Sequence, residues 1–395
     1  MEARRVPFAK PFTFVLALAC CFVLVQSTRA QSFNVIHNFT GGSDGANPLN
    51  GLMMGASGYM YGTTSAGGAY NNGTVFRIAP TGNFQTIYAF QGGADGSSPQ
   101  SFLIEDSQGR LYGTTSAGGA FGGGTVFRIA NNTKTILHNF GSGRDGSAPL
   151  GGLVFDRAGN LYGTTSAGGA NGNGTVFMLS PRGILWGETV LYSFGTGTDG
   201  AVPYAGVTLD SEGDVLGTTS AGGTSGYGTI FELSKQNSWA ETIVYNFTNQ
   251  DDGAVPYAGL IADGLGNFYG AATEGGSQGG GSIFELTPAG SGWNFNPFQS
   301  LPGSGISGTF RNLMLSSSGT LYATTHCDGE YSAGTVYQLV PGAGGTWTYS
   351  LLYTFTGGTD GLYSFSNLVT YANRLYGTTN QGGTYGHGVV FAVFP

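Results

Sequence analysis

One short segment of the sequence groups several chemically reactive residue types. His326, Cys327, Asp328 and Glu330 lie close together, and a thiol with an imidazole base within reach is a nucleophile used in catalysis. Because His326 and Cys327 are adjacent, in a strand their side chains would point to opposite faces. We therefore predict no catalytic residue in this segment. The candidates that this part of the chain offers for ligand binding are Arg311, His326, Asp328 and Glu330.

Aromatic and amide side chains recur at the tips of glycine-rich loops that follow Ser-Ala-Gly-Gly or a variant of it. Aromatic faces and amide groups suit neutral polar ligands such as sugars or peptides. The alternative is that these tips vary freely in solvent. The candidates for ligand binding at these positions are Tyr70, Asn71, Tyr227, Tyr331, Tyr385 and His387.

Aspartate followed by glycine recurs in six copies of another loop. A Ca²⁺ ion takes six to eight oxygen ligands, whereas each copy offers one acid with no second acid at a fixed spacing. We therefore predict turns in which the carboxylate accepts backbone N–H groups and glycine takes a positive φ. The histidines show no spacing typical of metal ligands, so we expect no metal and no cofactor. The six aspartates are Asp44, Asp95, Asp145, Asp199, Asp252 and Asp360.

Four tryptophans share a position in the sequence, since each precedes a run that ends a repeat. We predict that they pack on hairpins at the outside of the fold. The alternative is a platform for carbohydrate, because a flat indole suits the apolar face of a sugar. They are Trp186, Trp239, Trp293 and Trp347.

These candidates are distributed over a unit that returns seven times. Its third copy reads TILHNF, GSGRDGSAPLGG, LVFD, RAGN and LYGTTSAGGANGNGTVFML. A period of about 50 to 54 residues is typical of propellers and solenoids. Each unit holds four short β-type runs between turn residues, without a sustained helical period. We therefore predict an all-β, seven-bladed β-propeller of four-stranded antiparallel blades over residues 31–395.

The order of the runs predicts how the ring closes. The nearly continuous apolar runs, such as 101–105 and 152–156, suit the innermost strand of a blade. The chain starts with an outer-strand run at 34–39 and ends with a third-strand run at 388–394. We expect 34–39 to complete the last blade, which removes an open sheet edge. The crossing loops and the loops between second and third strands then share one face.

Residues 1–30 have the pattern of a secretory signal peptide. A basic start precedes an apolar run at 12–25, and the small residues Thr28 and Ala30 stand before a cleavage point at Gln31. The run is short for a membrane span, which needs about 20 residues. An uncleaved anchor is the alternative to a cleaved signal.

The charge balance limits the partners. Without residues 1–30, 10 Lys and Arg stand against 21 Asp and Glu, which disfavours nucleic acid and anionic membranes. Only one of the three cysteines, Cys327, lies outside the signal segment, so no intrachain disulfide is expected. These features predict a monomer that is secreted, either extracellular or periplasmic, without a membrane span after cleavage.

The motifs G-L-x-x-D-x-x-G-N-L-Y-G-T-T-S-x-G-G, G-T-V-F-x-L and T-V-L-Y-S-F-x-x-G-x-D-G-x-x-P run nearly unbroken through 161–169, 174–179 and 189–203. This repeat resembles the GloVer (Gloeo-Verruco) tandem repeat over residues 34–394. That family occurs in exported bacterial "choice-of-anchor" proteins, so the resemblance implies an exported propeller-like protein. It implies no activity, because the family has no established catalytic residues. The lack of a sorting segment after Phe394 favours a soluble form.

These observations favour an extracellular interaction or ligand-binding module for a neutral polar ligand, a glycan or a protein. One alternative is a hydrolase or lyase with its site on the glycine-rich loop face or in the central opening. Inner strands such as 52–54 and 260–262 offer neither paired carboxylates nor a histidine cluster, which argues against it. A second alternative is a structural component of the cell envelope.

Overall fold

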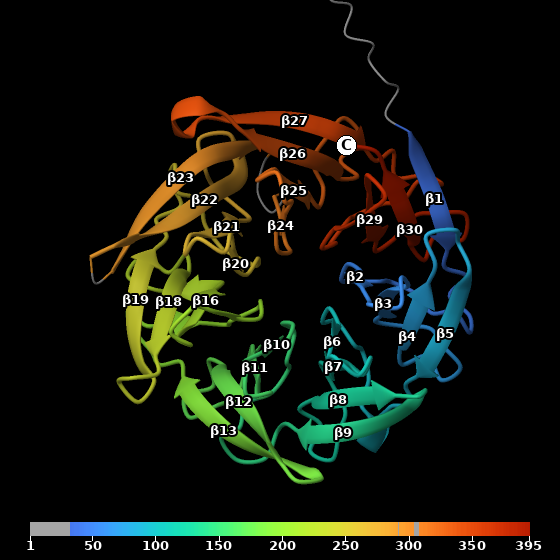
Figure 1. Ribbon diagram of the computed structural model, residues 1–395, viewed down its shortest axis with the longest axis horizontal. Coiled ribbons are helices and arrows are strands. Elements are labelled where there is room, and N and C mark those ends of the chain that lie inside the picture. Colours follow the sequence, from blue (N-terminus) through green and yellow to red (C-terminus); the bar gives the residue numbers. More distant parts are fainter. Residues whose placement is uncertain (1–31, 291, 304–307) are drawn as a thin grey trace, which may run out of the picture. The chain divides into compact units, whose positions relative to one another are not determined.

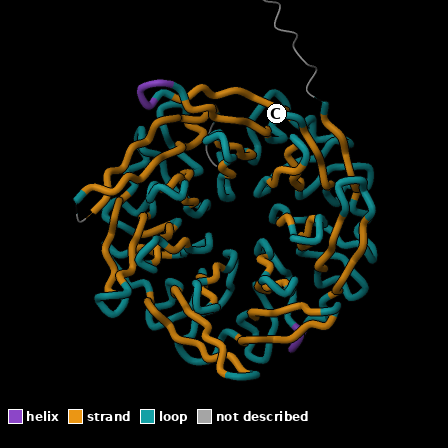
Figure 2. The backbone as a smooth tube through the Cα atoms, in the orientation of Figure 1, coloured by secondary structure: helices purple, strands orange, loops and turns teal. Residues whose placement is uncertain are grey.

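Seven four-stranded antiparallel sheets surround a central axis (Figure 1). The computed structural model describes residues 32–290, 292–303 and 308–395, so the predicted signal peptide lies outside the described residues. In six sheets the chain runs from the axis outward through all four strands, whereas in the seventh the outermost strand is the first strand of the described chain. Strand and loop alternate around the ring without a long helix (Figure 2). The predicted seven-bladed β-propeller is confirmed.

The strands are given from the axis outward. Blade 1 comprises β2 (Met53–Met54), β3 (Met60–Thr64), β4 (Thr74–Ile78) and β5 (Phe84–Ala89); blade 2, β6 (Ile104–Glu105), β7 (Leu111–Thr115), β8 (Thr125–Ala130) and β9 (Thr133–Asn139); blade 3, β10 (Val154–Phe155), β11 (Leu161–Thr165), β12 (Thr175–Arg182) and β13 (Leu185–Ser193); blade 4, β15 (Thr208–Leu209), β16 (Val215–Thr219), β18 (Thr229–Ser234) and β19 (Ala240–Asn246).

Blade 5 comprises β20 (Ile261–Ala262), β21 (Phe268–Ala272), β22 (Gly279–Ala289) and β23 (Gly292–Pro302); blade 6, β24 (Met314–Leu315), β25 (Leu321–Thr324), β26 (Thr335–Pro341) and β27 (Trp347–Thr354); blade 7, β28 (Val369–Tyr371), β29 (Arg374–Thr379), β30 (Val389–Val393) and β1 (Phe33–Asn38). The short strands β14 (Gly200–Ala201) and β17 (Ala221–Gly222) pair with each other. The 3₁₀ helices η1 (Gly93–Asp95) and η2 (Ala343–Gly345) are single turns, and among the described residues no helix has the length and apolar character to span a bilayer.

The middle strands form the core because neighbouring blades cover both of their faces. All five residues of β11 are buried, and Phe177 of β12 is fully buried. Gly163 of β11 lies directly against this ring, since a Cβ on it would stand 2.7 Å from Phe177 Cζ. The aromatic ring on the next strand therefore leaves no room for a side chain at this position of LYGTT, which explains the glycine. Blade 6 departs at both positions, with Ala323 opposite Tyr337.

The ring closes as predicted. Strand β1 pairs antiparallel with β30, and Val35 stands opposite Phe391. The ring of Phe33 stacks on Tyr353 of blade 6, with centroids 4.0 Å apart. One N-terminal and three C-terminal strands thus form blade 7, and no covalent link holds β1 to it.

The innermost strands are shorter than the sequence predicted. In blade 3 the expected strand over 152–156 is reduced to β10, Val154–Phe155. The residues before it pack against the neighbouring blade instead, because a Cβ on Gly151 would lie 2.4 Å from the carbonyl carbon of Ala205. Because the blades are crowded around the axis, the first residues of such an apolar run pack against the neighbouring blade and do not pair with the second strand of their own blade.

The crossing loops and the loops between second and third strands share one face, as expected. Isolated bridges join them in several blades, for example Ala46 to Ala66. The carboxylate of Asp252 accepts hydrogen bonds from Tyr245 Oη at 3.1 Å and from the N–H and hydroxyl of Thr248, both at 2.7 Å. Gly253 follows at φ +85°. The Asp-Gly loops are turns with a positive-φ glycine in five copies, whereas Gly200 lies in β14 and does not take a positive φ.

Candidate ligand-binding site

The predicted loop-tip residues stay apart. Tyr70, Tyr331 and Tyr385 are 54 to 57% exposed, and each lies on a loop of a different blade. Asn71 holds its own loop, since its Oδ1 accepts the N–H of Gly67 at 3.1 Å. The structure therefore does not gather these side chains into one site.

The other loop candidates are also dispersed. Tyr227 is 38% exposed on the β16–β18 connection, and Glu330 is exposed on the loop of blade 6. His387 stands over Gly41, where an added Cβ would meet its Nε2 at 2.5 Å. These three residues all lie on the loop face, but among the described residues they line no common cavity.

Arg311 and His326 belong to a cluster at the axis. Nε and Nη2 of Arg311, in blade 6, donate to Leu49 O in blade 1 at 3.3 and 3.1 Å, and the guanidinium lies over Tyr204 of blade 4. Only a side chain near the axis can reach two blades that are not adjacent to its own. Phe310 stands between His326 and Tyr257, with ring centroids 5.1 and 5.0 Å away.

This axial cluster is rich in aromatic rings and encloses the guanidinium of Arg311. Burial lowers the pKa of His326 to about 4, so its imidazole is neutral near pH 7. Each blade places one half-buried side chain at the position next to the axis, and four successive blades supply aromatic rings. These side chains are Leu49, Gln100, Leu150, Tyr204, Tyr257, Phe310 and Phe365.

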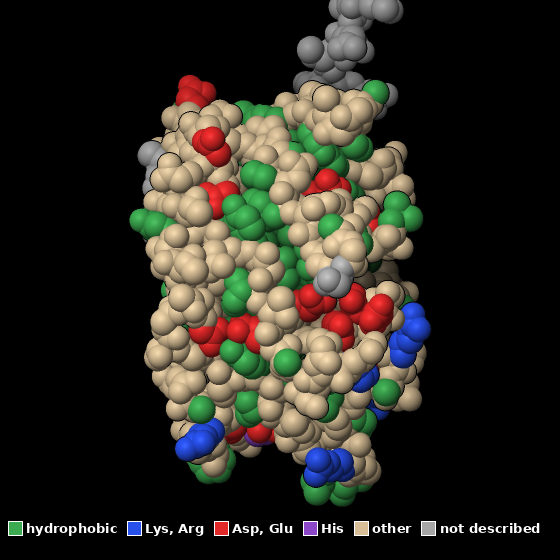
Figure 3. Space-filling view, turned by 90° about the vertical axis from the view of Figure 1, so that its left-hand side faces the viewer, with side chains coloured by type: hydrophobic (Ala, Val, Ile, Leu, Met, Phe, Trp, Pro, Cys, Tyr) green, Lys and Arg blue, Asp and Glu red, His purple; other side chains and the backbone are tan. Residues whose placement is uncertain are grey.

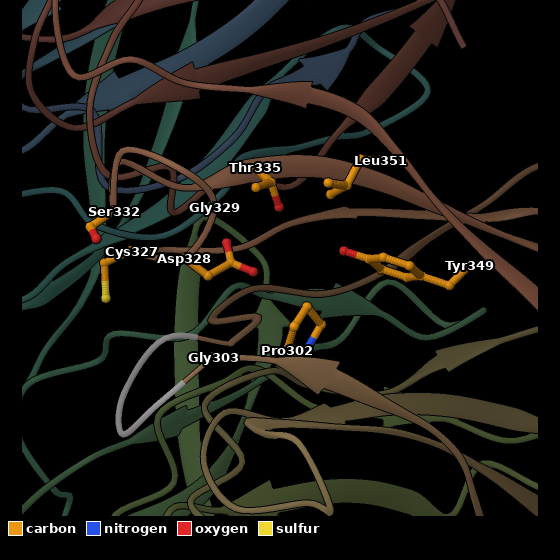
Figure 4. A pocket seen from close by; sticks show the side chains of 9 residues that line it. All are labelled: Pro302, Gly303, Cys327, Asp328, Gly329, Ser332, Thr335, Tyr349 and Leu351. Carbon is orange, nitrogen blue, oxygen red and sulfur yellow. The ribbon is translucent and has the colours of Figure 1, made fainter.

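Asp328 lines a separate cavity of about 280 Å³ between blades 5 and 6 (Figure 4). It is 8% exposed, its carboxylate accepts the hydroxyl of Thr325, and burial raises its pKa. Across the cavity it faces the hydroxyl of Tyr349 (Figure 4). Asp328 stands where other blades have glycine, and blade 6 lacks the Asp-Gly crossing loop. We therefore assign it a supporting role for the Thr325 hydroxyl.

A larger cavity of about 730 Å³ lies between blades 4 and 5, where the side chains of blade 4 depart from the repeat. In blade 3, Tyr162 Oη donates to Asp156 of the β10–β11 turn at 3.2 Å. Blade 4 has Leu216 at the tyrosine position, and a leucine cannot fill this space or supply a hydrogen bond. The departure leaves room beside the turn Asp, which is Asp210 in blade 4. We call this space the acidic cleft.

Two further departures add negative charge to the acidic cleft. Asp214 stands where blade 3 has Asn160, and Glu232 stands where blade 3 has Met178. Carboxylate oxygens of Asp210, Asp214 and Glu232 lie within 4.8 Å of one another. The space-filling view shows acidic side chains gathered on the side of the molecule that carries blades 4 and 5 (Figure 3).

Each of these carboxylates is fixed through one oxygen. Oδ1 of Asp210 accepts backbone N–H groups of its own turn at 2.9 Å, and Oδ1 of Asp214 accepts the N–H of Lys235 at 2.7 Å. Oε2 of Glu232 accepts the indole N–H of Trp293 at 3.2 Å. The second oxygen of each carboxylate receives no hydrogen bond from the described residues. Three acceptors therefore remain available to a ligand.

An aromatic wall lines the same cleft. Trp293 of β23 packs edge-on against Phe268, with ring centroids 5.3 Å apart, and both line the acidic cleft with Pro288. Burial raises the pKa of Glu232, and the negative charges of Asp214 and Asp210 act in the same direction. The three carboxylates could hold a divalent cation or accept several hydroxyl groups.

The acidic cleft was missed in the sequence, although a signal was present there. Leu216 and Asp214 are departures of the fourth repeat from both of its neighbours, and Glu232 is a departure from the third. The candidates were predicted in the divergent sixth repeat instead. In the structure, Arg311 and His326 lie at the axis and Asp328 lines a small cavity. Trp293 fulfils the predicted packing role and also lines the cavity.

The molecule is a seven-bladed β-propeller with a ligand-sized cleft between two blades. The chain belongs to the Gloeobacter/Verrucomicrobia repeat family, whose model matches residues 22–213 and 187–391. No curated protein matches the sequence.

Solved structures share the fold at low identity. The extracellular domain of a proposed one component system from B. thetaiotaomicron aligns with a TM-score of 0.56 and 13% identity, covering 91% of this chain and 42% of that chain. A proposed 6-phosphogluconolactonase from Bacteroides fragilis aligns with a TM-score of 0.52 and 18% identity, covering 83% of this chain and 86% of that chain. This chain thus spans less than half of the first of these proteins. Both similarities concern the fold alone.

Proposed function

We propose that this protein is an exported binding module that takes a neutral or positively charged carbohydrate in the acidic cleft. The observation that carries the proposal is the set of three unengaged carboxylate oxygens in the cleft that Trp293 lines. Sugar hydroxyls would donate to these oxygens, and the apolar face of a sugar ring would lie on the aromatic wall. Anionic glycans are disfavoured, because they would meet carboxylates without a balancing cation.

Export is part of the proposal. It is supported by the basic, apolar and small-residue pattern of residues 1–30. Expression in a bacterial host followed by N-terminal sequencing of the exported protein tests it, with Gln31 as the expected first residue. A protein retained in the cytoplasm with residues 1–30 intact would contradict it.

Ligand binding can be tested with a saccharide panel. Tryptophan fluorescence and calorimetry on the purified protein should find a neutral or amino sugar that binds, while uronic acids and sulfated sugars do not. The variant Leu216→Tyr restores the residue that fills this space in blade 3, so we expect binding at least 10-fold weaker. Binding that is unchanged by Leu216→Tyr, or a panel without any ligand, would refute the site.

A charge variant has a matched control in the chain. Glu232→Gln should weaken binding, because the neutral amide accepts ligand hydroxyls less strongly than a carboxylate. Glu285→Gln makes the same change at the corresponding position of blade 5, where the carboxylate accepts Tyr269 Oη at 2.9 Å. We expect Glu285→Gln to bind like the wild type. Equal losses in both variants would show a general effect on the fold.

Hydrolysis in the acidic cleft is the second candidate, because Glu232 is a carboxyl with a raised pKa beside other carboxylates. Against it, three carboxylates share this space, whereas glycosidases place one acid opposite one base or nucleophile. We therefore expect the saccharides that bind to be recovered intact. Turnover lost in Glu232→Gln would favour the enzyme.

A further inference from the structure

The contact between neighbouring blades repeats around the ring and varies in chemistry. A side chain on the outer strand of one blade meets a side chain on the outer strand of the next, beside the aspartate of the crossing loop. At the contact between blades 4 and 5 two rings meet, with Tyr245 stacked on Phe295 at 3.7 Å. At the contact between blades 1 and 2 the ammonium of Lys134 lies 2.7 Å from Asp95. The first of these contacts is made by aromatic rings, and in the second a positive charge balances a negative one.

The contact between blades 2 and 3 is different. It joins His138 of β9, Asp145 of the crossing loop and Glu188 of β13, and one ligand atom from each lies within 4.8 Å of the others. His138 Nε2 lies 3.2 Å from Asp145 Oδ2, and the side chains of these two residues are only 19% and 9% exposed. Two carboxylates therefore face each other beside one imidazole.

No protein group balances this contact among the described residues. Oε1 of Glu188 is buried without a hydrogen-bond partner, and neither oxygen of Glu188 accepts a hydrogen bond. Where Glu188 stands, the preceding contact has Lys134, whose ammonium pairs with the crossing-loop aspartate. Asp145 and Glu188 form no ion pair with a lysine or arginine. A buried carboxylate without a partner is costly, so a cation bound here would stabilise the contact.

The following contact places the same pair of acids around a phenol, although Oε1 of Glu241 is also buried without a hydrogen-bond partner. Tyr192 Oη lies 2.8 Å from Glu241 Oε2 and 3.1 Å from Asp199 Oδ2, so the phenol stands between the two carboxylates and donates its one proton to either of them. His138 occupies the position of Tyr192 and reaches only Asp145. Replacement of a phenol by an imidazole exchanges a hydrogen-bond donor for a metal ligand.

We propose that His138, Asp145 and Glu188 bind a Zn²⁺ ion that links blades 2 and 3. One imidazole nitrogen and two carboxylate oxygens are ligands of Zn²⁺, and three protein ligands leave a fourth, tetrahedral position to water. Ca²⁺ prefers six to eight oxygens, and this site offers too few. The ring of His138 is held in place by Phe140, whose centroid lies 4.6 Å away, and Asp145 Oδ1 accepts the N–H of Gly141 at 3.1 Å. Two of the ligands are therefore positioned before the metal arrives.

The test is calorimetry and thermal unfolding of the purified protein with any affinity tag removed, with Zn²⁺ and then Ca²⁺. We expect one Zn²⁺ per chain, a dissociation constant in the micromolar range or below and a melting temperature several degrees higher, with no effect of Ca²⁺. Glu188→Gln should weaken Zn²⁺ binding at least 10-fold. Glu241→Gln makes the same change at the next contact and should leave binding unchanged.

A second variant distinguishes loss of the metal site from loss of the fold. His138→Tyr gives this contact the residues of its neighbour, Tyr with Asp and Glu, so we expect it to fold and to lose the zinc response. The proposal is overturned if the wild type does not bind Zn²⁺. It is equally overturned if Zn²⁺ binds His138→Tyr and Glu188→Gln as it binds the wild type, or if Glu241→Gln loses binding as much as Glu188→Gln.

Discussion

Removal of the ring of Phe39 should allow β1 to detach from blade 7, whereas removal of the equivalent ring in blade 2 should not detach a strand. Phe39 follows β1, is fully buried and packs against His37 and Phe76 at centroid distances of 4.9 and 5.3 Å. Phe140 has the same position after β9, is also fully buried and packs against His138 and Phe177 at 4.6 and 4.9 Å. Truncation of either ring to alanine should cost about 3–5 kcal/mol in the free energy of unfolding.

The two variants should differ in what becomes mobile. Strand β1 is held by five paired positions with β30 and by its buried rings, and each ladder hydrogen bond contributes about 0.5–1.5 kcal/mol net. The loss at Phe39 is therefore comparable to all the hydrogen bonds of β1. In Phe140→Ala, β9 stays joined to β8 by a short turn, so a cavity forms without detachment.

Hydrogen exchange measured by NMR or mass spectrometry distinguishes these outcomes. In Phe39→Ala we expect the amides of β1 to exchange by local opening, well below the global free energy of unfolding, while the amides of β9 in Phe140→Ala stay close to the global value. Urea unfolding gives the global reference for both variants. Equal protection of β1 and β9 would refute the idea that the non-covalent contact is the weak point of the ring.

Three further predictions concern packing, charge and turns. Gly163→Ala places a methyl group 2.7 Å from Phe177 Cζ and should destabilise by about 1–3 kcal/mol in urea unfolding; a stability within 0.3 kcal/mol of the wild type, a margin roughly set by measurement error, would contradict this packing. Burial and the charge of Asp199 raise the pKa of Glu241 to about 7, so the folded state binds this proton more tightly than the unfolded state. Its contribution is present below pH 4.5 and lost as pH rises through 7, and Glu241→Gln should show a shallower fall of melting temperature between pH 5 and 8; an unchanged slope would argue against a buried acid. Asp252→Ala leaves the N–H groups of its turn and the Tyr245 hydroxyl without their acceptor and should cost about 2–4 kcal/mol in thermal unfolding, whereas a loss below about 0.5 kcal/mol would indicate that water replaces the carboxylate.

The repeat made the fold predictable. The period, the turn residues and the run at 34–39 were sufficient for the blade count, the order of strands and the closure by β1. The length of the inner strands was wrong, because crowding at the axis involves the backbone of a neighbouring blade, which local sequence does not reveal. Gly151 illustrates this, since its close neighbour Ala205 is 54 residues further along the chain.

The candidate sites were harder to predict, because they form between blades. Leu216, Asp214 and Glu232 become meaningful only when the fourth repeat is set against the third, and Trp293 comes from yet another repeat. His138 and Glu188 are 50 residues apart and belong to outer strands of two blades, so no metal-ligand spacing appears in the sequence. Arg311 and His326 come from one divergent repeat, but their partners around the axis come from other repeats.

The phase of the repeat against the blades has an evolutionary consequence. One unit of sequence starts at an outer strand and ends at the third strand of the following blade, so copying a unit inserts a complete blade together with the contacts on both of its sides. The pairing between β1 and β30 would not be changed by the duplication of a unit. Lineages with this repeat could therefore gain or lose whole blades, and a binding cleft formed by drift in one copy could change without disturbing the others.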